Sequence, residues 1–232
     1  MSLRSVYVSE PSFENDRIRI QGEEHRHLVV ARAEKDELIE IFDGKGKVWT
    51  ASVESVGKRE TVAALKQSRQ VTRDSIEVIL ALALIRIPAF ELALEKVVEV
   101  GVTRIVPFAA ARSNADLRRR RDRWVRIVIE AAKQSKRYYL PTLDAPNTFK
   151  GVLSIPAATK IMFAERAGGS LKSVLAGSPV LYLVGPEGGW TDQEMTAARE
   201  LGFHTVSFGA AILKAETAAI VGGSLIRYEL GE

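Results

Sequence analysis

The sequence contains no cysteine, only three histidines and no long apolar run. Without cysteine there can be no disulfide bond, no cysteine-ligated zinc and no thiol nucleophile. His25 and His27 are two positions apart on a predicted helix and do not share a face, so no metal site is expected. The apolar stretches are shorter than the roughly 20 residues that span a bilayer, and the N-terminus lacks the apolar core of a signal peptide. We therefore expect a soluble, cytoplasmic protein that does not insert into membranes.

The charge of the chain is small overall but unevenly distributed. The 232 residues include 33 Lys and Arg against 29 Asp and Glu, a net charge of +4. Residues 1–70 are neutral, residues 71–160 carry a net +7, and residues 161–232 carry a net −3. Residues 112–137 alone hold 10 basic and 3 acidic side chains. Such a local excess is typical of a surface that binds a polyanion, most often nucleic acid, and the alternative is a solvated helix face.

Short strands dominate the first 70 residues. Alternating polar and apolar residues predict strands over 5–8, 17–20, 38–42, 47–53 and, more weakly, 62–65, with one helix over 23–32. The turn pair Asp43-Gly44 separates the third strand from the fourth and indicates a hairpin. Several short strands at this spacing predict a small β-barrel domain over residues 1–70.

From residue 74 onward the pattern is that of an α/β domain. Residues 76–84 form an almost continuous apolar run, as in a strand that is buried on both faces. Further strands are predicted over 103–108, 160–164, 180–184 and 205–208, and helices over 88–101, 118–136, 170–177, 191–202 and 216–230. This alternation predicts a parallel sheet over residues 74–232, with ligands bound beyond the carboxyl ends of its strands.

Two loops that follow predicted strands can carry chemistry. In Gly185-Pro186-Glu187-Gly188-Gly189-Trp190 the glycines allow the backbone to approach a ligand closely, and the carboxylate suits a neutral or cationic ligand. The chain has neither a phosphate loop nor a G-x-G-x-x-G motif, and the alternative is a tight strand-to-helix turn. The second loop runs from Phe208 to Ala218. Its Glu216 and Thr217 suit a helix N-terminus, either as caps alone or, with Lys214, as contacts for a substrate.

Together these loops resemble the SPOUT superfamily of S-adenosylmethionine-dependent RNA methyltransferases. The segments that carry the resemblance are Gly185-Pro186-Glu187-Gly188-Gly189 and Leu213-Lys214-Ala215-Glu216-Thr217-Ala218. Within the superfamily, the bacterial 16S rRNA uracil-N3 methyltransferases (the RsmE type) are most similar. Further matches to them are found at Glu91–Lys96, Glu99–Val102, Arg112-Ser113 and Glu130–Ser135, and weaker ones at Arg4, His25 and Val30-Ala31-Arg32. Lys214 stands where that family usually has arginine.

The resemblance implies a fold and a reaction. It implies a PUA-like RNA-binding barrel over 1–70 and a SPOUT methyltransferase domain over 74–232 that contains a deep trefoil knot. It also implies a homodimer that binds S-adenosylmethionine, releases S-adenosylhomocysteine, and methylates N3 of one uridine in 16S rRNA, either naked or in the assembled small subunit. The alternatives are methylation of a ribose 2′-oxygen or another base, and a non-catalytic ribosome-assembly factor that binds RNA.

The resemblance also assigns site residues. The cofactor loops are implied to contribute Ala164, Glu165, Val184, Gly185, Pro186, Glu187, Gly188, Phe208, Gly209, Ile212, Leu213, Thr217 and Ala218. The residues implied to act in catalysis are Arg112, Lys214 and Glu216. The residues expected to contact RNA are Arg4, His25, Arg32, Arg118, Arg119, Arg123, Lys133 and Arg137.

Overall fold

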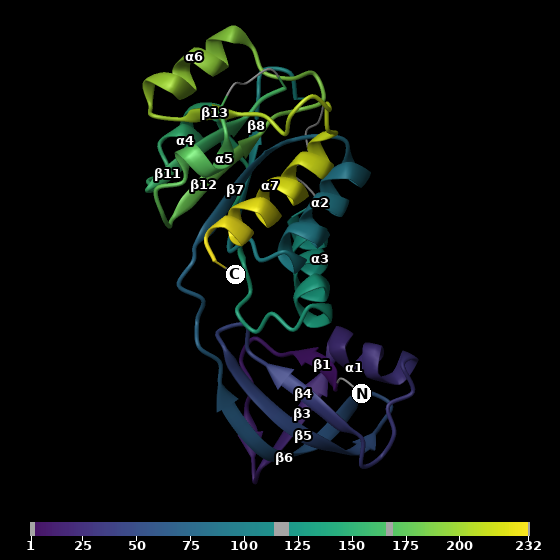
Figure 1. Ribbon diagram of the computed structural model, residues 1–232. Helices are drawn as coiled ribbons and strands as arrows, with labels where there is room; N and C mark the ends of the chain where they lie inside the picture. Colours follow the sequence, from purple (N-terminus) through teal and green to yellow (C-terminus); the bar gives the residue numbers. More distant parts are fainter. Residues whose placement is uncertain (1–2, 114–120, 166–168, 232) are drawn as a thin grey trace. The chain divides into compact units, whose positions relative to one another are not determined.

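The computed structural model describes residues 3–113, 121–165 and 169–231. The chain divides into two compact units (Figure 1): residues 1–73 with 132–140, and residues 74–131 with 141–232. The segment 132–140 therefore groups with the N-terminal unit, although it lies far beyond residue 70 in the sequence. Of the helices in the described ranges, none combines the length and apolar character needed to cross a membrane.

The N-terminal unit is built on one sheet with a short helix. Its strands are β1 (Arg4–Tyr7), β2 (Phe13–Glu14), β3 (Arg17–Gln21), β4 (Leu38–Phe42), β5 (Lys47–Val56) and β6 (Glu60–Gln70), and its helix is α1 (Gly22–Val30). The strand order is β1-β4-β5-β6-β3-β2, and every neighbouring pair is antiparallel except β1 with β4. Strand β6 is longer than the sequence predicts because its last five residues are exposed and polar, so no apolar alternation marks them.

The sheet of this unit buries one face. Its core consists of alternate residues from the strands, together with one leucine of α1: Val6, Ile18, Ile20, Leu28, Ile39, Ile41, Ala51, Val53 and Ala63. His25 of α1 is also buried, and its Nδ1 lies 2.9 Å from the hydroxyl of Thr61 on β6. Helix α1 is therefore fixed to the sheet by Leu28 and His25.

A half-buried carboxylate explains why residues 132–140 belong to this unit. Glu40 of β4 accepts hydrogen bonds from Lys136 Nζ at 2.7 Å, Tyr138 Oη at 2.9 Å and Arg69 Nη2 at 3.2 Å. Burial alone would raise the pKa of Glu40. The hydrogen bonds from Lys136, Tyr138 and Arg69 more than offset this effect and hold the pKa below its usual value.

We expect Glu40→Gln to lower the free energy of unfolding at pH 7 by about 1–3 kcal/mol, because the Lys136 ammonium loses its charged acceptor. The carboxylate stabilises the fold fully above the unfolded pKa of about 4.3 and loses this effect as pH falls through the lower folded pKa. The difference between the variant and the wild type should therefore shrink from pH 7 to pH 3 in urea denaturation. Glu54→Gln, at a solvent-exposed ion pair with Arg17, is the matched control and should change little. A difference of equal size at both pH values would contradict the prediction.

The C-terminal unit contains an all-parallel sheet. Its strands are β7 (Val78–Ala83), β8 (Arg104–Ala109), β9 (Thr142–Leu143), β10 (Asn147–Thr148), β11 (Thr159–Phe163), β12 (Val180–Val184) and β13 (His204–Val206). The order is β10-β8-β7-β12-β11-β13, and β9 also pairs with β8. The buried central strands β7 and β12 agree with the apolar runs in the sequence. Strand β13 ends at Val206 instead of the predicted residue 208.

Helices cover both faces of this sheet. The helices of this unit are α2 (Ile87–Glu99), α4 (Phe149–Leu153), α5 (Leu171–Val174), α6 (Asp192–Glu200) and α7 (Ala215–Glu229), and α3 (Arg121–Gln134) begins in it and ends in the segment 132–140. Residues of α4 and α6 share a core with alternate residues of β7 and β12. Helix α7 packs against β7, β12 and α2, and Figure 1 shows α2 and α7 side by side.

Two adjacent glycines bring α7 close to the sheet. A Cβ atom on Gly222 would lie 2.7 Å from the ring of Phe163, and one on Gly223 would lie 2.9 Å from the hydroxyl of Tyr182. That hydroxyl donates a hydrogen bond of 2.9 Å to the carbonyl of Ala219. Burial raises the pKa of Tyr182, so the hydroxyl stays protonated and able to donate.

A buried ion pair joins the two ends of the C-terminal unit. Arg227, near the end of α7, donates from Nη2 to Asp74 Oδ2 and from Nη1 to the carbonyl of Gly101 at 3.2 Å. The other oxygen of Asp74 accepts from the backbone N–H of Ile76 at 2.8 Å. The first and the last segments of this unit are therefore fixed to each other.

Candidate functional site

The loops singled out in the sequence lie at one edge of the parallel sheet. Strands β12, β11 and β13 are neighbours in the same direction, so the segments that follow Val184, Phe163 and Val206 emerge together. The backbone N–H of Ala164 donates to the carbonyl of Val206 at 2.9 Å, which joins two of these segments directly. The structure thus brings the three predicted cofactor segments to a common edge.

Residues 185–190, which we call the glycine loop, fold back on themselves. A Cβ atom on Gly185 would lie 2.8 Å from the Trp190 ring, and Gly189 adopts a φ of +68°, which favours glycine. Trp190 is fixed from two sides. Its Nε1 donates to the carbonyl of Phe163 at 2.8 Å, and its ring stacks on Phe108 at a centroid distance of 6.2 Å. The shape of the loop therefore depends on contacts with β11 and β8.

Arg112, in the loop after β8, contacts the backbone of the glycine loop. Its Nη1 donates to the carbonyls of Gly188 at 2.8 Å and Trp190 at 3.3 Å. A Cβ atom on Gly188 would lie 3.1 Å from Cβ of Arg112, so glycine is what lets the two loops approach. The sequence suggests Arg112 as a functional residue because of its charge. It does not indicate that Arg112 contacts the backbone of the glycine loop.

Glu194, in the first turn of α6, accepts a hydrogen bond from the backbone of the loop that carries Arg112. The predicted capping box of α6 is present, and Glu194 Oε2 accepts from the backbone and hydroxyl of Thr191 at 2.9 and 3.0 Å. Its Oε1 accepts from the backbone N–H of Ala111 at 2.9 Å, and the residue is 6% exposed. Only the capping signal is visible in the sequence. The contact with Ala111 depends on tertiary structure.

Glu187, the carboxylate of the glycine loop, is held by Arg86 at the start of α2. Its Oε1 accepts from both the backbone N–H and Nε of Arg86, each at 3.3 Å. Burial alone would raise the pKa of Glu187, but hydrogen bonds from its own backbone N–H and from Arg86 hold the pKa below its usual value. A carboxylate so stabilised is a weak general base, and Glu187 is better suited to attract a cation.

The third segment leads into α7. Helix α7 begins at Ala215 with Lys214 as its N-cap, and no side chain of the N-cap residue bonds to the helix. Glu216 lies in the first turn and is half-buried, whereas Lys214 is exposed. Phe208 stacks on Phe163 at 4.3 Å, and Ile212 is 71% exposed. The segment thus offers one apolar side chain, one carboxylate and one ammonium near the edge of the sheet.

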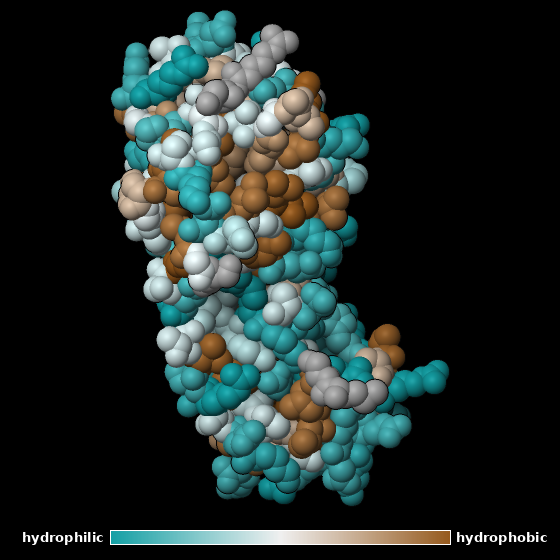
Figure 2. Space-filling model, in the orientation of Figure 1, coloured by the Kyte–Doolittle hydropathy of each residue, from teal (hydrophilic) through white to brown (hydrophobic). Residues whose placement is uncertain are grey.

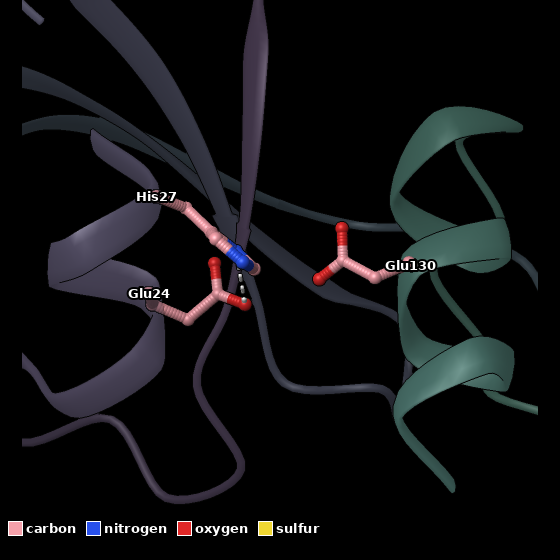
Figure 3. A group of neighbouring side chains, drawn as sticks. All are labelled: Glu24, His27 and Glu130. Atoms are coloured by element: carbon pink, nitrogen blue, oxygen red, sulfur yellow. Dashed lines mark ion pairs between the residues drawn. The ribbon is translucent and has the colours of Figure 1, made fainter. Parts of the chain in front are cut away.

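The residues expected to contact RNA are in different environments. His25 is buried and contacts Thr61, so its ring is not available to a ligand at the surface. The Lys133 side chain is 10% exposed, with Nζ 2.9 Å from Glu24 Oε1 and 3.2 Å from His27 Nδ1. Figure 3 shows Glu24 and His27 side by side on α1. Lys133 therefore already has an anionic partner within the N-terminal unit.

The arginines of this group are more accessible. Arg123 is 62% exposed at its side chain and donates from Nη2 to Glu91 at 2.7 Å, and Arg4 donates to Glu37 at 2.9 Å. Arg32 is exposed and adopts a φ of +53° just after α1. Arg137 is half-buried. Arg118 and Arg119 lie outside the described residues.

Family comparisons match both parts of the chain. A model of an RNA methyltransferase domain matches residues 72–227, and a model of an RNA methyltransferase PUA domain matches residues 20–65. The first match alone covers more than half of the chain and includes all three segments at the edge of the sheet.

Individual relatives cover nearly the whole chain. A protein of Synechocystis named ribosomal RNA small subunit methyltransferase E is 31% identical over 95% of this chain and 76% of its own length. One of the same name from Mesomycoplasma hyopneumoniae is 30% identical over 84% of this chain and 86% of its own length. A crystal structure of ribosomal RNA small subunit methyltransferase E from Neisseria gonorrhoeae bound to S-adenosyl methionine has a TM-score of 0.91, with 29% identity over 98% of both chains.

Proposed function

Because the chain belongs to the RNA methyltransferase family, we propose that it transfers a methyl group from S-adenosylmethionine to N3 of a uridine in 16S rRNA. The observation that carries this proposal is the similarity over 98% of the chain to a ribosomal RNA small subunit methyltransferase E solved with the cofactor bound. S-adenosylhomocysteine is the second product. The substrate is the small-subunit RNA, either naked or within the assembled subunit.

The chemistry of the sheet edge fits this cofactor. S-adenosylmethionine has a cationic sulfonium, an ammonium and a neutral adenine, and it brings a methyl group that is already activated for transfer. The carboxylates of Glu165 and Glu187 complement its positive charges. The exposed Ile212 supplies an apolar contact. The residues of the three segments proposed to bind it remain those inferred from the family resemblance.

Deprotonation of the uracil is the step that this chain must assist. N3 of uracil bears a proton that it must lose before nitrogen can attack a methyl group, so a base and a nearby cation are required. Glu187 is occupied by Arg86, which leaves Glu216 as the proposed base. Lys214, exposed and two residues away, is the proposed cation beside the uracil oxygens or a phosphate. The rest of the rate enhancement comes from positioning the two reactants.

The N-terminal unit is proposed to form a PUA-like barrel that binds RNA. The match of residues 20–65 to a PUA domain supports this role, and so does a largely antiparallel sheet. Arg4, Arg32 and Arg137 remain the proposed phosphate contacts of this unit, and Arg123 that of the C-terminal unit, among the described residues. His25 is left out of this set because its ring is buried, and Lys133 would have to exchange Glu24 for a phosphate.

The C-terminal unit is proposed to contain a trefoil knot and to form a homodimer in the cytoplasm. Strand β13 is the outermost strand on its side of the sheet. The next helix, α7, nevertheless packs on the central strands β7 and β12, which supports a threaded chain. Leu92, Val125, Leu225 and Tyr228 expose apolar or aromatic surface on α2, α3 and α7, as a second copy requires. Figure 2 shows hydrophobic side chains gathered in the region of α7.

A methyl-transfer assay tests the proposal. Purified protein is incubated with methyl-labelled S-adenosylmethionine and small subunits from cells that lack this gene, and the RNA is digested to nucleosides for mass spectrometry. We expect 3-methyluridine. Labelled 2′-O-methyluridine or another methylated base would overturn the assigned target. Failure to bind the cofactor in calorimetry would instead favour a non-catalytic RNA-binding factor.

A further inference from the structure

Arg112 lies where it shapes the glycine loop. Its Nη1 donates to two backbone carbonyls of that loop, those of Gly188 and Trp190. From these contacts we infer that Arg112 is a positioning residue, which acts on methyl transfer through the glycine loop and does not touch the target base. The inference deepens the proposed function and rests on it.

The loop that carries Arg112 is itself held in place. Its turn is closed by hydrogen bonds from Ser113 N to the carbonyl of Ala110 at 3.1 Å and from Ala110 N to Ser113 Oγ at 3.0 Å. The buried carboxylate of Glu194 then binds the N–H of Ala111. The β8 loop is therefore held by two links: Arg112 donates to the backbone of the glycine loop, and Glu194 in the first turn of α6 accepts from the backbone of Ala111.

The two links differ in burial, since Arg112 is exposed whereas Glu194 is buried. A guanidinium that donates to a carbonyl forms a charge-assisted hydrogen bond, which is about twice as strong as a neutral one. Gly188 and Gly189 would otherwise give the loop much freedom, because glycine loses more conformational entropy on ordering than any other residue. By fixing the carbonyls on either side of Gly189, Arg112 sets the direction of the peptide groups that a cofactor would meet.

The inference is tested with Arg112→Ala and Arg112→Lys, and with Arg199→Ala on α6 as a control that removes the same charge from an exposed site. Amide hydrogen exchange of residues 185–190 is measured in the cofactor-free protein, followed by the Kd for S-adenosylmethionine and by kcat. Arg112→Ala should speed exchange and raise the Kd by about 10-fold each, the equivalent of one charge-assisted hydrogen bond. At saturating cofactor, kcat should fall by less than about 10-fold. Arg112→Lys should restore part of both effects, and Arg199→Ala should match the wild type.

Wild-type exchange and cofactor affinity in Arg112→Ala, combined with a large loss of kcat, would overturn the inference and place Arg112 on the target base. Glu194→Gln provides a second test. It should also speed exchange in residues 185–190, and its effect should not add to that of Arg112→Ala because both variants release the same loop. Fully additive effects would contradict the inference. Since exchange is measured without cofactor or RNA, these outcomes are separate from a failure of the wild type to methylate uridine.

Discussion

Replacing Gly185 by valine is expected to lower the affinity for S-adenosylmethionine by about 100-fold, and replacing it by alanine by about 10-fold. The first added carbon would lie 2.8 Å from the Trp190 ring, a distance at which one of the two groups must move. Trp190 is held by its hydrogen bond to Phe163 and its stack on Phe108, so the backbone of the glycine loop has to shift. A loss of 100-fold equals about 2.7 kcal/mol, within the range for overpacking a tight site.

The measurement is calorimetric titration of each variant with S-adenosylmethionine and with S-adenosylhomocysteine, with circular dichroism to verify the fold. A double-mutant cycle tests whether the clash with Trp190 causes the loss of cofactor affinity. Trp190→Ala removes the ring atoms that Gly185→Ala would strike, so Gly185→Ala should cost less affinity in the Trp190→Ala background than in the wild type. Equal costs in both backgrounds would show that the clash with Trp190 is not the cause of the loss. Wild-type affinity in Gly185→Val would contradict binding of the cofactor by the loop.

Asp74→Ala is expected to destabilise the C-terminal unit by roughly 2–4 kcal/mol. It removes the Asp74 carboxylate from the Arg227 guanidinium, which is 10% exposed, and removing one partner of a buried pair is strongly destabilising. We place the effect at the lower end of the range for such pairs because Asp74 is itself 26% exposed. The variant also loses the hydrogen bond from the backbone of Ile76.

Urea and thermal unfolding measure this loss. The double variant Asp74→Ala with Arg227→Met should recover much of it, since an apolar side chain does not require a counter-charge. Glu95→Ala is the control, because it breaks an ion pair with Lys96 at the surface and should unfold like the wild type. A double variant that is less stable than Asp74→Ala alone would show that Arg227 acts mainly through its hydrogen bond to Gly101.

Much of the fold follows from local sequence patterns. The apolar runs at β7 and β12 and the capping box at Thr191 predict elements that the structure contains, because burial on both faces and helix capping depend on neighbouring residues. The short strands β2, β9 and β10 and the helix α4 were not predicted. Each has two to five residues, too few to show a period, and the three strands form because the longer strands β3 and β8 offer a partner.

The candidate site, like the fold, is only partly predictable from the sequence. Glycines and carboxylates mark the three segments in the sequence, and parallel topology then places the segments together. The partners of their side chains are not visible in the sequence, because Arg86 and Glu187 are separated by 101 residues and Arg112 and Gly188 by 76. For the same reason the burial of His25 and the grouping of residues 132–140 with the N-terminal unit emerge only from tertiary contacts.

The ion pair between Asp74 and Arg227 has a consequence for the synthesis of the protein. Its partners are 153 residues apart in the sequence. The central strand β7 likewise pairs with β12, which is synthesised about a hundred residues later. Contacts between such distant segments slow folding, and those that involve the last helix cannot form until it has left the ribosome. The C-terminal unit should therefore complete its core only after α7 has left the ribosome and can pack on the sheet, whose earlier strands expose apolar surface until then.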